Sequence, residues 1–170
     1  MVNDIQNNLI KKESIFGPDN YKPLPVVLSK AKGVWVWDVD ERKYLDMMSG
    51  YSAVSHGHAH PELLRVFHEQ SSKLSLTSRA FYTDTLGPYL ETITKISGFE
   101  MCLPMNSGAE AVETAIKSSR RWAYRTKKVA PGKAEIIVAE GNFHGRTTTI
   151  ISFSTDENSR HDFGPHTPGF

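Results

Sequence analysis

The sequence predicts an α/β fold, with a small antiparallel N-terminal segment followed by the start of a mainly parallel sheet. Aromatic residues that alternate with valines between about Val26 and Met47 are typical of antiparallel strands. Further along, an apolar stretch, a long amphipathic helix, a second apolar stretch and a glycine-bounded turn follow in the order of a parallel α/β unit. Because only two convincing parallel strands are present, the 170-residue chain is expected to hold an incomplete fold.

The first half of the chain is expected to contain three helices around this antiparallel segment. Apolar residues at near-helical spacing predict a helix from about Asp4 to Ser14, and a proline-rich loop follows it. Pro61 suits the first turn of a second helix that continues to about Leu74. A third helix is predicted from about Thr83 to Ile96, ending at Gly98.

The second half is organised around the stretch PMNSGAEAVETAIKSSRRW, residues 104–122. Residues 101–105, MCLPM, which overlap the start of this stretch, predict a short strand. A long amphipathic helix is expected from about Gly108 to Lys127. The continuous apolar run AEIIVAE, residues 134–140, predicts a strand buried on both faces. It leads into the turn GNFHGR.

Composition and charge exclude several classes of function. The formal net charge of +1 gives no overall attraction to nucleic acid or to an anionic membrane. No apolar run approaches the roughly 20 residues that span a bilayer. The N-terminal letters lack the apolar core of a secretory signal, and the single cysteine fits a reducing compartment. We therefore expect a cytoplasmic protein that binds neither nucleic acid nor membrane.

The two turns after the predicted parallel strands are the candidate ligand site. Ligands of open α/β sheets bind beyond the carboxyl ends of the strands, where NSGAE and GNFHGR would face one crevice. Ser107 followed by Glu110 fits a capping box, but a helix start also binds phosphate when no bulky side chain blocks it. Phe143, His144 and Arg146 either complete this crevice or are scattered loop residues.

Three alternating histidines, His56, His58 and His60, form the run HGHAH. Such a run can ligate a metal, but no cysteine or carboxylate adjoins it and Pro61 begins a helix at once. A solvated or hydrogen-bonded loop is therefore expected, with no metal.

Five motifs in order make the chain resemble the class III, fold-type I aminotransferases that depend on pyridoxal 5′-phosphate (PLP). They are NYKPLPVVLSKAKGVWVWDVD, YSAV…GHAHP, LTSRAFY, LPMNSGAEAVETAIK and GNFHGRT…FGP…PGF, and they cover about Asn20 to Phe170. NYxPLPVVL and TSRAFY favour the ornithine-specific group. The resemblance implies that residues 1–50 begin the small domain. Residues 51–170 would begin the three-layer α/β/α PLP-binding large domain.

The resemblance also implies roles for individual residues. Backbone N–H groups at Ser107, Gly108 and Ala109 would hold the cofactor phosphate, and small residues there would let it approach. Phe143 would stack on the pyridine ring, and His144 would lie beside the cofactor.

Substrate contacts follow from the same resemblance. Arg146 would bind the substrate α-carboxylate as a bidentate fork. Tyr21 would meet the α-amino group, and Tyr51 would line the pocket and help select the amine. The implied substrates are ornithine and 2-oxoglutarate, with acetylornithine or 4-aminobutyrate as alternative donors.

The Schiff-base lysine of the family has no counterpart among the twelve lysines, none of which lies in an apolar run. We therefore expect a fragment, or the product of a split or degraded gene, without turnover by itself. A non-catalytic remnant or dimerising piece is the alternative. Family members are homodimers, with segments such as LTSRAFY near the subunit boundary.

Overall fold

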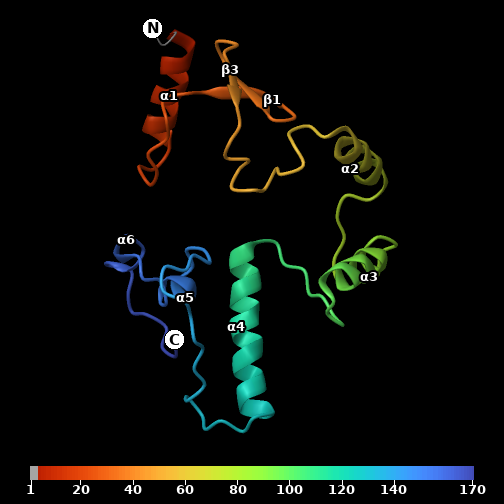
Figure 1. The fold of residues 1–170 in the computed structure, drawn as a ribbon, viewed down its shortest axis with the longest axis vertical. Coiled ribbons are helices and arrows are strands. Elements are labelled where there is room, and N and C mark those ends of the chain that lie inside the picture. The colour runs from red at the N-terminus through yellow and green to blue at the C-terminus, as the bar shows by residue number, and fades with distance from the viewer. Residues whose placement is uncertain (1–3) are drawn as a thin grey trace. The chain divides into compact units, whose positions relative to one another are not determined.

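The computed structural model describes residues 4–170, which form two compact units, residues 4–81 (unit 1) and residues 82–170 (unit 2). Unit 1 contains one helix, a three-stranded sheet and a second helix: α1 (Asp4–Phe16), β1 (Leu28–Lys32), β2 (Trp35–Asp38), β3 (Lys43–Leu45) and α2 (Pro61–Lys73). Unit 2 is helical: α3 (Leu86–Ser97), α4 (Gly108–Arg125), α5 (Thr148–Ile151) and α6 (Glu157–Arg160) (Figure 1). The domain boundary predicted near residue 50 stays a prediction.

The antiparallel N-terminal segment is confirmed as the meander β1-β2-β3. Ala31 pairs with Val36 across the first hairpin, and Val36 pairs with Tyr44 across the second. Val36 is the buried apolar residue of the sheet, whereas the tryptophans on either side of it are more exposed. The alternation that predicted the strands therefore separates an inner from an outer face.

The side chain of Gln6 attaches α1 to the segment that leads into β1. In Figure 1, α1 lies beside the three-stranded sheet. The Gln6 side chain is 1% exposed. Its amide nitrogen donates to the carbonyl of Pro25, and its amide oxygen accepts from the N–H of Val27, both at 3.3 Å. A buried polar side chain with both ends bonded fixes the helix without the cost of an unpaired group.

Asp38 organises the turn between β2 and β3. Its carboxylate is fully buried. One oxygen accepts the N–H groups of Asp40 and Arg42 at 2.9 Å each, and the other accepts the hydroxyl of Tyr44 at 2.7 Å. Burial is the largest influence and raises the pKa of Asp38, but these hydrogen bonds together outweigh it, so that the pKa lies below its usual value.

Asp38→Asn is expected to destabilise unit 1 at pH 7 and to cost less as the pH falls. A carboxyl whose pKa is lowered by folding stabilises above its unfolded pKa, about 3.9, and this stability is lost as the pH falls through the lower native value. Denaturant unfolding followed by tryptophan fluorescence at pH 7 and pH 3 measures the difference. Asp19→Asn, at an exposed position, is the control. An equal loss at both pH values would contradict the prediction.

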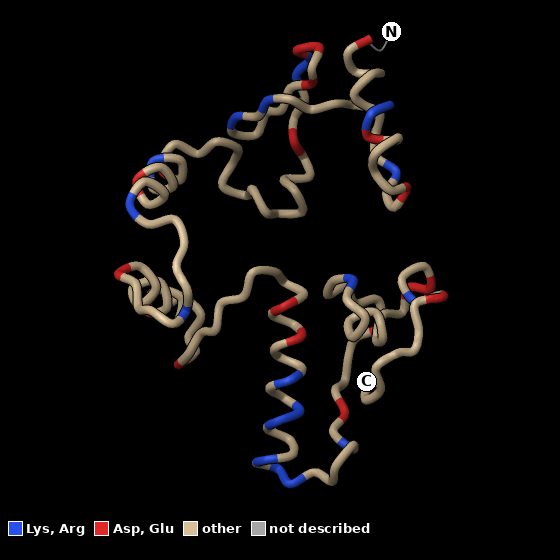
Figure 2. Tube along the Cα trace, turned by 180° about the vertical axis from the view of Figure 1, so that it is seen from behind, with Lys and Arg blue, Asp and Glu red and all other residues tan. Residues whose placement is uncertain are grey.

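Unit 2 confirms the two helices predicted for this part of the chain. α3 ends at Gly98, whose φ of 74° is the left-handed conformation expected of a glycine cap. In α4 the acidic residues lie in the first turns and the basic residues in the later ones (Figure 2), an arrangement that complements the helix dipole. The core of the unit is Ile116 of α4 with Ile150 and Phe153.

The two parallel strands predicted in unit 2 are wrong for this structure. Residues 101–105 and 134–140 form no strand, and neither segment pairs with a strand among the described residues. Met101 is 89% exposed and Ile137 is 100% exposed. An apolar run becomes a strand only when a neighbouring backbone accepts its hydrogen bonds. Within residues 4–170, the two segments make a single such bond, from the N–H of Ile136 to the carbonyl of Gly169. The short helices α5 and α6 were not predicted.

Within residues 4–170 no helix combines the length and the apolar character that crossing a membrane requires.

Candidate functional site

The start of α4 forms the capping box that the sequence predicts. Ser107 Oγ accepts the N–H of Glu110 at 3.2 Å. In return, Glu110 Oε2 accepts the N–H groups of Asn106 at 2.8 Å and Ser107 at 3.2 Å. The box therefore satisfies the amides before the helix and the third amide within it. The hydroxyl proton of Ser107 is left to donate to another acceptor.

Two amides at this helix start remain available for an anion. The N–H groups of Gly108 and Ala109 have no acceptor in the part of the chain that the structure describes. A Cβ added to Gly108 would meet no atom of another segment within 4 Å, so the described residues leave the helix start at Gly108 uncrowded. Two free N–H groups, a hydroxyl and the positive end of the helix dipole are the donor set that a phosphate requires.

The turn 141–146 lies directly beside this helix start. A Cβ added to Gly145 would stand 3.0 Å from the Cβ of Ala109, and only a glycine allows that approach with its φ of 127°. Thr147, just after the turn, donates a hydrogen bond from its hydroxyl to Glu113 of α4. The sequence does not predict this bond, because nothing in the spacing of the two residues marks it.

The aromatic and basic side chains of the turn, Phe143, His144 and Arg146, are exposed but contact different neighbours. Phe143 is 73% exposed, and the guanidinium carbon of Arg146 lies 6.0 Å from the centre of its ring. No carboxylate pairs with Arg146 among the described residues, so its fork is available for an anionic ligand. His144 instead lies against the buried Phe153, with ring centres 5.9 Å apart.

Tyr21 and Tyr51 come together within unit 1, although 30 residues separate them. Their hydroxyl oxygens are 2.8 Å apart, and both side chains are exposed. Tyr51 lies in a left-handed turn, Ser49–Ser52, in which all four residues have φ between 50° and 73°. Each residue other than glycine costs about 1–2 kcal/mol in that conformation, so the surrounding contacts must hold the turn.

The histidine run is a hydrogen-bonded loop. His58 Nε2 lies 2.7 Å from Asp46 Oδ2, and the rings of His56 and His60 meet edge to face with centres 6.3 Å apart. Nowhere in residues 4–170 do three histidine, cysteine or acidic side chains gather as a metal would require.

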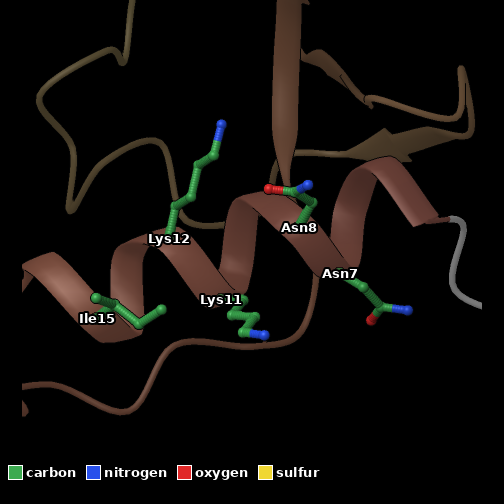
Figure 3. A pocket seen from close by; sticks show the side chains of 5 residues that line it. All are labelled: Asn7, Asn8, Lys11, Lys12 and Ile15. Carbon is green, nitrogen blue, oxygen red and sulfur yellow. The ribbon is translucent and has the colours of Figure 1, made fainter.

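Two of the surface hollows are each lined by a single helix. One is lined by residues of α1 alone, Asn7, Asn8, Lys11, Lys12 and Ile15. Figure 3 shows Asn8 and Lys12 pointing to one side of the helix and Asn7 and Lys11 to the other, so these groups do not converge on a ligand. Another lies on the basic face of α4, again on a single helix.

Comparison with known proteins identifies relatives of the whole chain. The model of the aminotransferase class-III family matches residues 16–170. Ornithine aminotransferase from Brevibacillus brevis is 57% identical over 164 residues, covering 96% of this chain and 41% of the relative. The chain therefore spans about 40% of the length of the curated relatives that it matches.

Two solved structures match nearly the whole chain. Ornithine aminotransferase from Toxoplasma gondii, described with partial occupancy of PLP at its active site, is 40% identical with a TM-score of 0.95. Acetylornithine aminotransferase from Elizabethkingia anophelis is 55% identical with a TM-score of 0.80. Both matches cover 97% of this chain and 39% of the neighbour's. They establish the fold as that of the PLP-dependent, fold-type I aminotransferases, to which the antiparallel meander and the helices belong.

Proposed function

Because the chain belongs to the aminotransferase class-III family, we propose that it is the cofactor-binding part of an ornithine aminotransferase. The reaction would transfer the δ-amino group of ornithine to 2-oxoglutarate and yield glutamate 5-semialdehyde and glutamate. The observation that carries the proposal is the helix start of α4, where free amides at Gly108 and Ala109 adjoin the turn that bears Phe143 and Arg146.

The residues present fit PLP. Its phosphate would accept hydrogen bonds from the N–H groups of Gly108 and Ala109 and from the hydroxyl of Ser107. Among the described residues, none outside the start of α4 crowds a Cβ added at Gly108. The flat pyridine ring of PLP matches the exposed face of Phe143, with His144 next in the chain. Bound PLP supplies the electron sink that amino-group transfer requires.

The substrate would be oriented by two groups of this chain. Arg146 would bind the α-carboxylate with its guanidinium fork, so that the distal amine faces the cofactor. The paired hydroxyls of Tyr21 and Tyr51 would receive the α-amino group. Ornithine carries both recognised groups, and its free α-amino group is what separates it from an acetylated donor.

The purified 170-residue chain is expected to show no transaminase turnover with ornithine, 2-oxoglutarate and PLP. All twelve lysines are exposed, so none has the desolvated setting that activates a lysine as a base or nucleophile. Formation of glutamate, measured with a coupled assay, tests this. Turnover that survives repurification would contradict the prediction.

A hybrid enzyme tests the proposed activity. In it, this chain replaces its matched segment in the Brevibacillus brevis relative, which supplies the remaining residues. We expect turnover with kcat/KM at least about tenfold higher for ornithine than for acetylornithine or 4-aminobutyrate. Acetylornithine is the second candidate, because the acetylornithine aminotransferase from Elizabethkingia anophelis is 55% identical to this chain. A preference for that donor would overturn the ornithine assignment.

We further propose that the complete enzyme is a cytoplasmic homodimer. Phe81 is 68% exposed and Tyr82 is 100% exposed. Both belong to the segment LTSRAFY, which the family places near the subunit boundary. Sedimentation of the hybrid enzyme tests the dimer, and a monomer that retains full activity would contradict it.

A further inference from the structure

In unit 1, the two ends of the loop between Asp46 and His58 are held together by a side-chain contact and by backbone hydrogen bonds. The two half-buried side chains meet through the 2.7 Å contact between Asp46 Oδ2 and His58 Nε2. The backbone of His58 exchanges two hydrogen bonds of 2.8 Å with Gly33, in the hairpin between β1 and β2. Asp46 also donates its N–H to the carbonyl of Val34 at 2.9 Å. Both ends of the loop are therefore attached to the same hairpin.

Asp46 also holds the beginning of the left-handed turn. Its other carboxylate oxygen, Oδ1, accepts the N–H groups of Met48 at 3.0 Å and Ser49 at 2.9 Å. The hydrogen bond with His58, followed by those from Ser49 and Met48, lowers the pKa of Asp46. The ionised carboxylate can thus serve all of these partners at neutral pH.

The end of the loop is closely packed as well. Gly57 has a φ of 86°, and a Cβ there would stand 3.3 Å from the Cα of Gly33. The closure thus depends on a backbone approach that a larger residue would obstruct. Between these two fixed ends lies the turn that carries Tyr51 to the hydroxyl of Tyr21.

We propose that Asp46 and His58 are positioning residues, which hold the Tyr51 turn against Tyr21 and thereby set which amine donor the enzyme accepts. The positioning rests on the geometry of unit 1 alone. The effect on the donor rests on the proposed function, in which the two tyrosines meet the substrate. A left-handed turn of L-residues does not persist without such contacts, and the Asp46 carboxylate contacts both its start and the residue that closes the loop.

Nuclear Overhauser effects in the 170-residue chain, labelled with ¹³C-tyrosine, test the positioning. We expect cross-peaks between the rings of Tyr21 and Tyr51 in the parent chain and their loss in His58→Ala. His58→Gln should restore them, because its amide N–H can donate to Asp46. His56→Ala is the matched control, since the ring of His56 contacts His60 rather than the base of the loop.

Two outcomes would overturn the positioning. One is the persistence of the Tyr21–Tyr51 cross-peaks in His58→Ala. The other is the simultaneous loss of the indole signals of Trp35 and Trp37, because the pair would then support the sheet as a whole rather than the turn.

The hybrid enzyme tests the effect on the donor. His58→Ala is expected to raise KM for ornithine at least about tenfold and to shift the preference between ornithine and acetylornithine, while KM for 2-oxoglutarate stays unchanged. His58→Gln should reverse these changes. If His58→Ala loses the Tyr21–Tyr51 cross-peaks but keeps the parent's preference between ornithine and acetylornithine, the proposed effect on the donor is overturned. If the parent hybrid accepts none of ornithine, acetylornithine and 4-aminobutyrate, the proposed function and the donor effect are both refuted. The Tyr21–Tyr51 cross-peaks would still decide whether Asp46 and His58 position the Tyr51 turn.

Discussion

Gly108→Asp in the hybrid enzyme is expected to weaken PLP binding by about 100-fold or more and to abolish turnover at ordinary cofactor concentrations. The new carboxylate would stand at the start of α4, where Gly108 has room for a side chain and the free amides of Gly108 and Ala109 lie. Two like charges about 4 Å apart repel by about 1 kcal/mol in water and about 4 kcal/mol near a protein surface. Together with the lost access to the amides, this accounts for the expected change.

Equilibrium dialysis followed by absorbance of bound PLP measures the affinity. Gly87→Asp is the matched control, since Gly87 also lies in the first turn of a helix, α3, where an added Cβ would meet no atom within 4 Å. Gly108→Ala should give an intermediate loss, because it fills part of the same space without adding charge. Equal affinities for the Gly108→Asp and Gly87→Asp enzymes would contradict the phosphate assignment.

Arg146→Ala in the hybrid enzyme is expected to reduce kcat/KM for ornithine by about 100-fold. A hydrogen bond to a charged group is worth about 1.5–3 kcal/mol, and the guanidinium fork can make two to one carboxylate. Its position above Phe143, with no carboxylate partner among the described residues, leaves the fork available for this role.

The sharpest measurement compares ornithine with 1,4-diaminobutane, which is ornithine without its carboxylate. Loss of Arg146 should collapse the preference between these two donors, whereas Arg121→Ala, at an exposed position of α4, should leave it unchanged. Arg146→Lys should recover only part of the preference, because an ammonium keeps the charge but not the fork. An undiminished preference in Arg146→Ala would remove this residue from substrate recognition.

Local patterns in the sequence were sufficient for the four longer helices, the meander and the capping box. The spacing of apolar residues, Pro61 at a helix start and Gly98 at a helix end act over a few neighbouring residues, so they need no distant partner. Ser107 and Glu110 also act over a short distance, because their reciprocal hydrogen bonds follow from a separation of about one helical turn. The family, too, could be recognised from motifs alone, and the comparisons bear it out.

Only the tertiary structure decided which distant groups meet. The approach of Gly145 to Ala109, the Tyr21–Tyr51 pair and the Asp46–His58 closure join residues whose separation in sequence carries no signal. The same reason explains the two wrong strands, since AEIIVAE has the composition of a buried strand but pairs with no strand among the described residues and makes one backbone hydrogen bond there, from Ile136 to Gly169. Local conformation depends on neighbouring residues and can therefore be predicted from the sequence. Strand pairing and the assembly of a site depend instead on which surfaces the folded chain brings into contact.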